Sequence, residues 1–516
     1  MEKFLYERLK NKNPKINVWF AFPAPESLGM SSLGYLSIFK QIDLMEDVFV
    51  ERIFSDTKIT AANPENLSVI GFSNSFEIDI LTILKMLSKY NIPPLSKDRS
   101  EDCPLIFAGG PVLTANPIPF EEFYDFISIG DAKTTFDNIF KVLVEKKDES
   151  REAKLQALSE IEGVWVPKYG KEKPVKKITD TLEEPLYTPI LSDKSYFKDT
   201  FIIEIERGCP KTCNFCIASW LNLPVRYTPL EKIIGAIDFG LQHTRKIALL
   251  GAYVAGHPDF DKILEYIREK NKTAPVELTL SSLRADLTSE NVIKTLVECG
   301  QKTATIAVEA GSERLRRVIN KDLTDEQILK TVETARLYGL KGLKIYAMVG
   351  LPTETNEDID ALINLMKRIK ATNKGFELTL SVSSFIPKAH TPFQWSKKAD
   401  SKELDVKLAH LKNQISKIGI NVRPTSIEWD LIQSILSRAS FSLASYILKV
   451  IENGGNLGAF KQTWRKMAKS GILPELNSYA AQPISENPDS KLPWEFICVT
   501  DKEILKKRLN DALKSS

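Results

Sequence analysis

The stretch FIIEIERGCPKTCNFCIAS, residues 201–219, joins a strand-like apolar run to a loop with three cysteines. Cys209, Cys213 and Cys216 form a C-x3-C-x2-C pattern directly after this run. Three thiolates from one loop can surround one centre, and thiolates select soft metals or iron–sulfur clusters. A structural zinc site needs a fourth Cys or His ligand, and the chain has four histidines and no second CxxC pair. The pattern predicts a [4Fe–4S] cluster with one open iron; ordinary buried cysteines or a zinc loop are the alternatives.

The cysteine loop stands at the start of a regular alternation of strand and helix patterns that runs from residue 200 to about 390. The strand patterns lie at 201–206, 246–254, 276–285, 303–311, 343–352 and 378–387, with a helical pattern after each of the first five. This order predicts a (β/α)6 partial barrel, in which functional residues gather at the carboxyl ends of the strands.

The first 147 residues also alternate between strand and helix patterns. Short apolar runs that end in Gly or Ser predict a Rossmann-like, doubly wound parallel sheet. In such a sheet, ligands bind outside the carboxyl ends of the strands. The candidate binding residues at those ends are Ser73, Asn74, Ser75, Gly109, Gly110 and Gly130.

We therefore expect an α/β protein in four parts. Residues 1–147 form the Rossmann-like domain, and 148–195 form a linker whose apolar piece at 163–167 can add an edge strand. Residues 196–395 form the partial barrel with the cysteine loop. Residues 396–516 form a mainly helical accessory region, which we expect to close the open side of the barrel.

Composition indicates a folded protein without a membrane or nucleic-acid signal. Hydrophobic residues make up 43% and charged residues 27% of the 516 positions, and the net charge is only +3. The N-terminus is charged, and no apolar run approaches the roughly 20 residues that span a bilayer. Six cysteines in a chain of this length do not indicate a disulfide framework. We expect a cytoplasmic protein.

Residues 200–390 resemble the radical S-adenosylmethionine (SAM) superfamily. The resemblance includes the C-x3-C-x2-C loop with an aromatic residue, Phe215, just before the third cysteine. It implies that the three thiolates hold the cluster and that the methionyl amine and carboxylate of SAM bind the open iron. Reduction then cleaves SAM to methionine and a 5′-deoxyadenosyl radical. A low-potential electron donor, flavodoxin or ferredoxin, is the implied partner.

The resemblance also implies a binding site for the methionyl part of SAM. Gly251 and Ala252 match the small residues of a turn after the second strand, which receives the methionine amine in the family. The acidic residue that usually completes that turn is absent. Ser282 and Arg284 end the third strand and are the implied partners of the methionine carboxylate. A surface ion pair is the alternative for Arg284.

Three further residues are placed by the same resemblance. Glu309 ends the fourth strand and matches the acidic residue that binds the SAM ribose; a carboxylate at a helix N-terminus is the alternative. Gly350 matches a turn that packs near adenine, and a plain strand-to-helix turn is the alternative. His390 lies in PKAHTPFQW (387–395), after the sixth strand, and we interpret it as a structural histidine.

PKAHTPFQW and the front domain together are similar to the branch of the superfamily that carries an N-terminal cobalamin-binding-type domain. The Asp-x-His-x-x-Gly signature of cobalamin proteins is absent, since no histidine precedes His243. Lys133 stands where relatives usually carry an acidic residue. A docking domain with no cofactor is therefore the alternative for residues 1–147.

Cysteine numbers exclude the relatives that hold a second cluster. Methylthiotransferases need three further cysteines in the front domain, which has only Cys103; Cys299 and Cys498 are interpreted as buried thiols.

By resemblance, the predicted reaction is cobalamin-dependent methyl transfer to an unactivated carbon. A cobalamin-independent rearrangement or peptide or RNA modification, and a non-catalytic redox sensor, are the alternatives. The sequence identifies neither a substrate nor a catalytic side chain.

Overall fold

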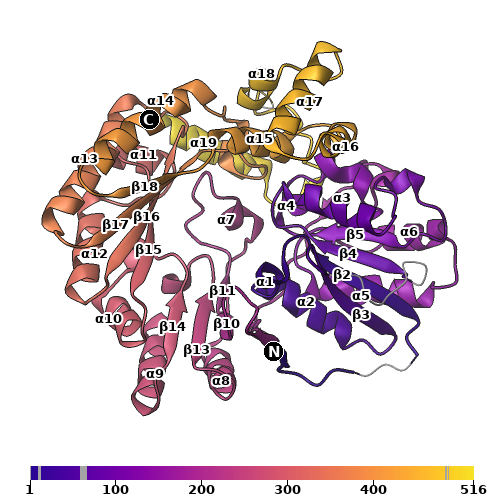
Figure 1. Ribbon diagram of the computed structural model, residues 1–516, viewed down its shortest axis with the longest axis horizontal. Helices are drawn as coiled ribbons and strands as arrows, with labels where there is room; N and C mark the ends of the chain where they lie inside the picture. Colours follow the sequence, from indigo (N-terminus) through magenta and orange to yellow (C-terminus); the bar gives the residue numbers. More distant parts are fainter. Residues whose placement is uncertain (1, 10–12, 58–66, 483–484, 486, 516) are drawn as a thin grey trace.

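The computed structural model describes residues 2–9, 13–57, 67–482, 485 and 487–515. It confirms the predicted α/β fold, with parallel sheets and a helical C-terminal region. Figure 1 shows the front domain on one side and the barrel on the other, with the C-terminal helices running across both. The same views place the cysteine-loop helix α7 (Ile217–Leu221) between the two units.

The front domain is built on a six-stranded sheet with the order β3-β2-β4-β5-β6-β7. Its strands are β2 (Ile16–Phe22), β3 (Val48–Phe54), β4 (Val69–Ser73), β5 (Leu105–Gly109), β6 (Phe126–Ser128) and β7 (Val164–Trp165). The first five are parallel and β7 is antiparallel to β6. The edge strand expected at 163–167 is therefore present.

Helices cover both faces of the front sheet. Those of the front domain are α1 (Glu26–Gly29), α2 (Leu33–Asp43), α3 (Asp79–Lys89), α4 (Pro111–Ala115), α5 (Lys133–Glu145) and α6 (Arg151–Ser159). Side chains of α2, α5 and α6 share one core with the sheet. The other face packs against α3 and against helices from the C-terminal region.

The barrel contains seven parallel strands in two sheets. The first sheet holds β10 (Thr200–Glu204), β13 (Lys246–Leu250) and β14 (Glu277–Leu280). The second holds β15 (Thr303–Glu309), β16 (Gly342–Val349), β17 (Glu377–Ser384) and β18 (Asn421–Pro424). A single bridge between Leu283 and Ile306 links them. The sequence predicted six of these strands. The seventh, β18, follows one more helix crossover and carries the barrel sheet past residue 395.

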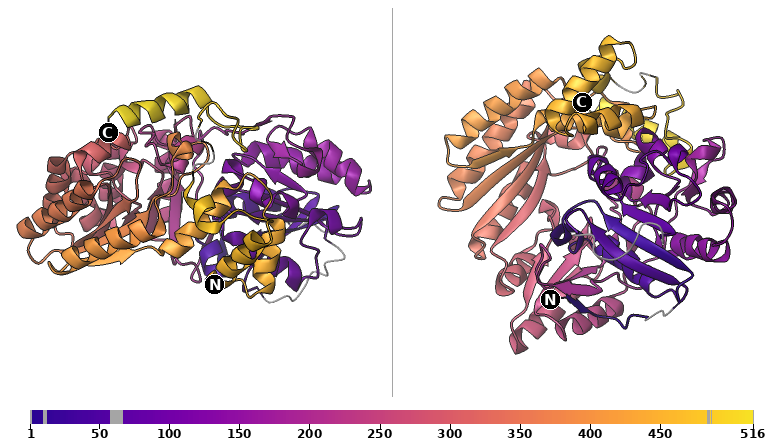
Figure 2. Two further views of the ribbon diagram at one scale, coloured as in Figure 1. Left: turned by 90° about the horizontal axis from the view of Figure 1, so that it is seen from above. Right: turned by 45° about the vertical axis from the view of Figure 1, so that its right-hand side comes forward.

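The barrel helices lie outside this arc of strands (Figures 1 and 2). They are α8 (Leu230–Leu241), α9 (Phe260–Thr273), α10 (Glu290–Glu298), α11 (Glu313–Val318), α12 (Asp325–Leu337), α13 (Asn356–Thr372) and α14 (Ser401–Ser416). Thr324 and Gln327 form a capping box that starts α12, which agrees with the helix punctuation in the sequence. Thr355 and Asp358 do the same for α13.

Opposite sides of the barrel strands differ in polarity. Ile345, Ala347 and Val349 of β16 are buried in the core that the outer helices share. The intervening Lys344 and Tyr346 face the other side and are accessible to solvent. Because side chains alternate along a strand, the inner wall of the barrel is polar and open.

The C-terminal region closes the barrel only in part, which corrects our expectation. Its helices are α15 (Ile427–Arg438), α16 (Ala444–Glu452), α17 (Leu457–Lys469), α18 (Leu476–Ala481) and α19 (Lys502–Lys514). α15, α16 and α17 bury their apolar faces against the front sheet. α19 packs near the barrel mouth, against α11 and the turn Pro392–Trp395. The region thus joins the two units.

The remaining strands are short. They are β1 (Glu2–Phe4), β8 (Val175–Lys176), β9 (Ile190–Ser192), β11 (Glu206–Arg207), β12 (Arg226–Tyr227) and β19 (Ile497–Cys498). Cys299 is buried as expected, whereas Cys498 is exposed because β19 pairs only with β8 at an edge. In the described ranges, no helix is long and apolar enough to cross a membrane.

A buried ion pair ties the front sheet to its surface loops, and we expect its loss to be costly. Asp125 forms ion pairs with Arg99 at 2.9 Å and with Arg151 at 2.5 Å, and the side chains of Asp125 and Arg99 are fully buried. Asp125→Ala leaves Arg99 without its carboxylate, which should lower the free energy of unfolding by about 3–5 kcal/mol. Urea denaturation measures the change. Glu149→Ala removes the exposed pair with Lys146 and is the control; equal effects of both substitutions would contradict the prediction.

Candidate active site

A small hairpin closes the base of the cysteine loop. The strand pair β11 and β12 brackets residues 208–225, so the three cysteines lie between two paired segments. Gly208 has φ +94°, and a Cβ there would lie 2.6 Å from the carbonyl oxygen of Asn222. Glycine is therefore required where the loop leaves the strand.

The segment after α11 holds the cysteine loop from the barrel side. The backbone N–H of Asn214 donates to Ile319 at 3.0 Å, and its side-chain amide donates to Val318 at 2.8 Å. Asn320 returns a hydrogen bond to the carbonyl of Lys211 at 2.7 Å. Neither asparagine was predicted, because their partners lie over 100 residues away in the chain.

The loop opens onto a cavity of about 190 Å³ that brings most of the predicted site residues together. Among the predicted residues, its lining includes Cys209, Cys213, Cys216, Phe215, Ala252, Ser282, Arg284 and Glu309. Lys211, Tyr253 and Lys321 line it as well and were not predicted. These residues come from the loop and from the carboxyl ends of β13, β14 and β15, where a barrel site is expected.

The three thiols share one cavity, as the ligands of a cluster would. In a [4Fe–4S] cube each thiolate binds a different iron, so its ligands surround a space. Burial raises the pKa of Cys213 to about 12 and also raises the pKa of Cys209. Iron binding therefore has to displace protons from these thiols.

Glu309 and Lys321 form an ion pair at the wall of this cavity. Lys321 Nζ lies 3.2 Å from Glu309 Oε1, and both side chains are largely buried. Glu309 has φ +71°, an unusual backbone conformation for a non-glycine residue that is often found at functional sites. Glu309 thus projects a carboxylate beside the cysteine loop.

Arg284 lines the same cavity but has partners of its own. Its Nε lies 2.7 Å from Asp286, and its guanidinium donates to the carbonyl of Lys321. Arg284 thus forms an ion pair, which was the alternative to a role in binding the methionine carboxylate, and this ion pair lies in the cavity wall. Lys321, whose carboxylate partner is Glu309, is a second cation available to an anionic group here.

Glu206 supports the turn that follows β13. Its carboxylate accepts the backbone N–H of Tyr253, and its side chain is fully buried. A Cβ on Gly251 would lie 2.3 Å from Glu206 Oε1, so only glycine leaves room for this carboxylate. Gly251 thus lies behind the cavity wall, while Ala252 reaches the cavity.

Gly350 lies outside the cysteine cavity. Its φ is +79°, and a Cβ there would lie within 3 Å of Ala399 and Leu404. Its N–H donates to Glu354 at 2.8 Å in the turn that leads to α13. The plain-turn interpretation accounts for this geometry, and its contact with adenine stays a prediction.

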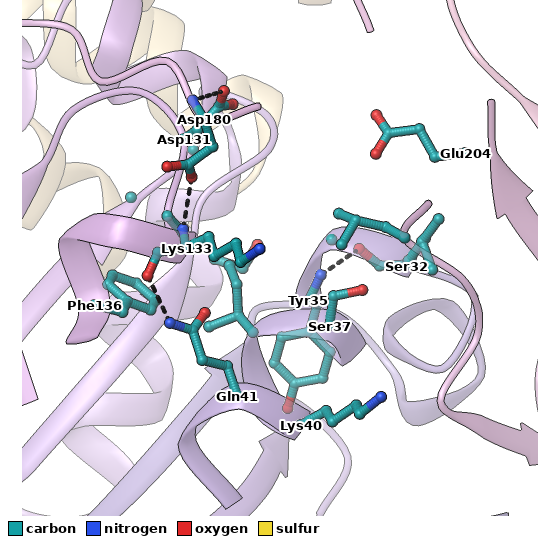
Figure 3. Close-up of a pocket in the computed structure, with 18 of the residues that line it drawn as sticks. Ser32, Tyr35, Ser37, Lys40, Gln41, Asp131, Lys133, Phe136, Asp180 and Glu204 are labelled. Atoms are coloured by element: carbon teal, nitrogen blue, oxygen red, sulfur yellow. Dashed lines mark hydrogen bonds between the residues drawn. The ribbon is translucent and has the colours of Figure 1, made fainter. Parts of the chain in front are cut away.

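A second, larger cavity of about 560 Å³ lies at the carboxyl ends of the front strands (Figure 3). Of the predicted residues, Ser73, Ser75, Gly109, Gly110 and Gly130 line it. Asn74 does not; it is buried and its amide donates to Tyr124 at 3.4 Å.

Other walls of the larger cavity come from α2, from the start of α5 and from the barrel. Lys133 extends into it in Figure 3. Glu204 and Leu250, at the ends of β10 and β13, close it on the barrel side. The cavity therefore lies between the two α/β units.

An ion network connects the larger cavity with the cysteine loop. Asp131, which follows β6, forms ion pairs with Arg207 at 3.0 Å and with Arg226 at 2.5 Å. Arg207 also pairs with Glu204 at 2.5 Å. Because Arg207 precedes Cys209 by only two residues, the wall of the larger cavity is directly linked to the cysteine loop.

His390 is buried, with φ +58°, and its backbone N–H donates to Gln394 at 2.9 Å. Burial lowers its pKa to about 3, so the imidazole is neutral at ordinary pH. It lines neither of the two cavities described above, but it lines a third one of about 650 Å³ together with Gln394 and Trp494. Its structural role therefore stays a prediction.

Burial raises the pKa of Glu206 to about 7, and this predicts a pH dependence of stability. Between the ordinary carboxyl pKa and 7, the folded protein keeps a proton that the unfolded chain has released. The free energy of unfolding should therefore fall as pH rises through that window, by about 3 kcal/mol in total. Glu206→Gln removes the charge. Urea denaturation should show a higher free energy of unfolding for the variant than for the wild type at pH 8 but not at pH 5. Glu204→Gln is the control. A stability gain of Glu206→Gln that is the same at both pH values would refute the assignment.

Two family models match the front domain and the barrel separately. Residues 34–167 match the N-terminal domain of radical SAM proteins, and residues 203–366 match the radical SAM superfamily. An uncharacterized protein of Methanocaldococcus jannaschii is 30% identical over 443 residues, which cover 84% of this chain and 90% of that protein. An uncharacterized methyltransferase of Pyrococcus horikoshii is 26% identical over 338 residues, covering 61% of this chain and 70% of the other.

Two solved structures share the fold over 97% of the chain. One is the radical SAM methyltransferase TsrM from Kitasatospora setae with cobalamin and a [4Fe–4S] cluster, with a TM-score of 0.53, 12% identity and 99% of that chain covered. The other is the cobalamin-dependent radical SAM enzyme OxsB, with a TM-score of 0.53, 15% identity and 79% covered. With three cysteines and Glu309 around one cavity at the barrel mouth, the chain belongs to the radical SAM superfamily of enzymes and has the two-unit architecture of its cobalamin-type branch.

Proposed function

We propose that this enzyme binds a [4Fe–4S] cluster through Cys209, Cys213 and Cys216 and cleaves SAM reductively. We further propose that it binds cobalamin in the larger cavity and transfers a methyl group to an unactivated carbon. The observation that carries the proposal is the pair of cavities, which lie at the carboxyl ends of two parallel sheets; Arg207 in the wall of the larger one stands two residues before Cys209 in the smaller one.

In the smaller cavity, each side chain has a role that its chemistry supports. When bound and reduced, the cluster supplies the electron that breaks the carbon–sulfur bond of SAM. Glu309 accepts the ribose hydroxyls, exchanging its contact with Lys321 for them. Ser282 and the cations Arg284 and Lys321 bind the methionine carboxylate. The turn at Ala252, held by Glu206, presents its backbone to the methionine amine.

In the larger cavity, bare backbone supports the binding of a flat macrocycle. Gly110 has φ +121°, and a Cβ there would lie 2.3 Å from the carbonyl oxygen of Asn74. Gly130 has φ +96°, so both strand ends present backbone without side chains. The volume falls within the usual range for cofactor sites, about 300–1,000 Å³. When bound, cobalamin carries the methyl group between SAM and the substrate.

No histidine of the described residues lines this cavity, so the residues that would hold cobalamin here are backbone groups and other polar side chains. Lys133 is exposed at its edge, where its ammonium can meet a polar substituent of the corrin. For reduction of the cluster we propose a low-potential donor, flavodoxin or ferredoxin.

SAM cleavage tests the first part of the proposal. Anaerobically reconstituted and reduced wild-type protein should convert SAM to 5′-deoxyadenosine, measured by chromatography. Cys213→Ala should abolish this product because the cluster loses a ligand. Cys103→Ala, outside the cavity, should retain it. A bound cluster without product above the Cys213→Ala level would favour the redox-sensing alternative.

Corrin retention tests the second part. After incubation with hydroxocobalamin and desalting, the wild type should retain about one corrin per chain, read from its absorption spectrum. Ser37→Phe places a ring in the larger cavity and should reduce retention at least tenfold. Ser88→Phe, on the exposed face of α3, is the matched control. No retention by the wild type would favour a cobalamin-independent radical reaction.

A further inference from the structure

The inner wall of the barrel carries two rows of mostly polar side chains next to the cysteine cavity, whose lining includes Ala307 of the upper row. Registered residues of neighbouring parallel strands share a side of the sheet. One row contains Thr305, Lys344, Thr379 and Asn421, and the next contains Ala307, Tyr346, Ser381 and Arg423. All eight alternate with the buried residues that face the outer helices, and all are at least partly exposed.

This composition is unusual for a barrel interior. Branched apolar side chains normally fill such a space. Here hydroxyl, amide and cationic groups line it, and Tyr346 is 38% exposed. Such a surface gains little from burying apolar substrate and is suited to a polar ligand.

Lys344 and Arg423 are the charged residues of the two rows. Lys344 Nζ lies 3.2 Å from the hydroxyl of Tyr346 and 4.8 Å from its ring centroid, so the ammonium is raised along the wall toward the mouth. Arg423 is exposed on β18. In the part of the chain that the structure describes, neither cation has a carboxylate within 4.0 Å. The other inner-wall lysine, Lys246, does have one, Glu277 at 3.9 Å.

The two cations lie on the same side of the sheet. Tyr346 pairs with Ser381, and Ser381 pairs with Arg423, across three adjacent strands. Lys344 lies two residues before Tyr346 on the same strand, so with about 4.8 Å between strands and about 3.3 Å per residue its Cα atom is about 12 Å from that of Arg423. Long cationic side chains can close that distance onto one anionic group, with the hydroxyl of Ser381 beneath it.

Acidic residues mark the limits of this cationic zone. Glu377 lies at the lower rim, two residues before Thr379 on β17. Glu309 lies at the upper end of β15, already paired with Lys321. An anion would therefore be held between these rims, below the cysteine cavity.

We propose that the inner wall binds an anionic group of the substrate, a carboxylate or a phosphate, through Lys344 and Arg423. This specificity site deepens the proposed function, on which it rests: the anion is anchored inside the barrel, and the carbon to be modified is presented at the mouth. A substrate with no anionic group makes no charge-assisted contact with these two cations and is bound less tightly than one that has such a group.

Equilibrium anion binding tests the proposal. Isothermal titration of cluster-loaded protein with inorganic pyrophosphate and, separately, with tricarballylate gives the two dissociation constants. We expect the wild type to bind at least one probe, and the preferred probe distinguishes a phosphate from a carboxylate substrate. The double variant Lys344→Met/Arg423→Met should weaken that binding at least tenfold. Lys246→Met, on the same wall but paired with Glu277, should leave it within twofold.

Equal binding by the double variant and the wild type, or no binding of either probe by the wild type, would overturn the proposal. The urea midpoint of each variant shows that the fold is kept, and the single variants Lys344→Met and Arg423→Met replace the double variant if it is unstable. The titration uses neither SAM nor reductant. Failure of SAM cleavage therefore leaves this result standing, and failure of anion binding leaves SAM cleavage standing.

Discussion

The ion network around Asp131 is the constraint on which the relation between the two cavities depends. Arg207 and Arg226 flank the cysteine loop on paired strands, and both reach the same carboxylate of the front domain. Exposed ion pairs contribute little, but these side chains are mostly shielded from water, and removing Asp131 would leave two cations together. The front domain thus fixes one side of the cysteine loop, while Asn214 and Asn320 fix the other.

Local patterns predicted the fold well where one segment determines one element. The C-x3-C-x2-C spacing and the alternation of strands and helices were read from neighbouring residues, whereas Glu309 was assigned through the family resemblance. β18 was missed because its short segment NVRP has only one buried residue, Val422, and no strand periodicity. The role of α15, α16 and α17 was misjudged because the apolar face of a helix does not reveal which sheet it covers.

Local patterns predicted the residues of the candidate site less completely than they predicted the fold. Lys321, Asn320 and Glu206 have ordinary local sequence surroundings, and their importance arises from contacts with distant segments. One signal was present: Glu206 stands next to the cysteine loop, and Gly251 stands where the family's acidic turn is incomplete. The structure shows that a Cβ at 251 would strike the Glu206 carboxylate, so a residue from the neighbouring strand supports this turn from behind.

Charge placement around the barrel mouth suggests why the site is built from buried groups. Cys213 is only 6% exposed, and burial raises its pKa to about 12, so this thiol is neutral at ordinary pH. A thiolate-ligated cluster would bring negative charge into this space, and Lys321 and Arg284 are already fixed beside it. Their ammonium and guanidinium groups offset the cost of that charge without any rearrangement of the loop. Lys344 and Arg423 of the inner wall lie on other strands and do not line the cysteine cavity, so they take no part in this compensation.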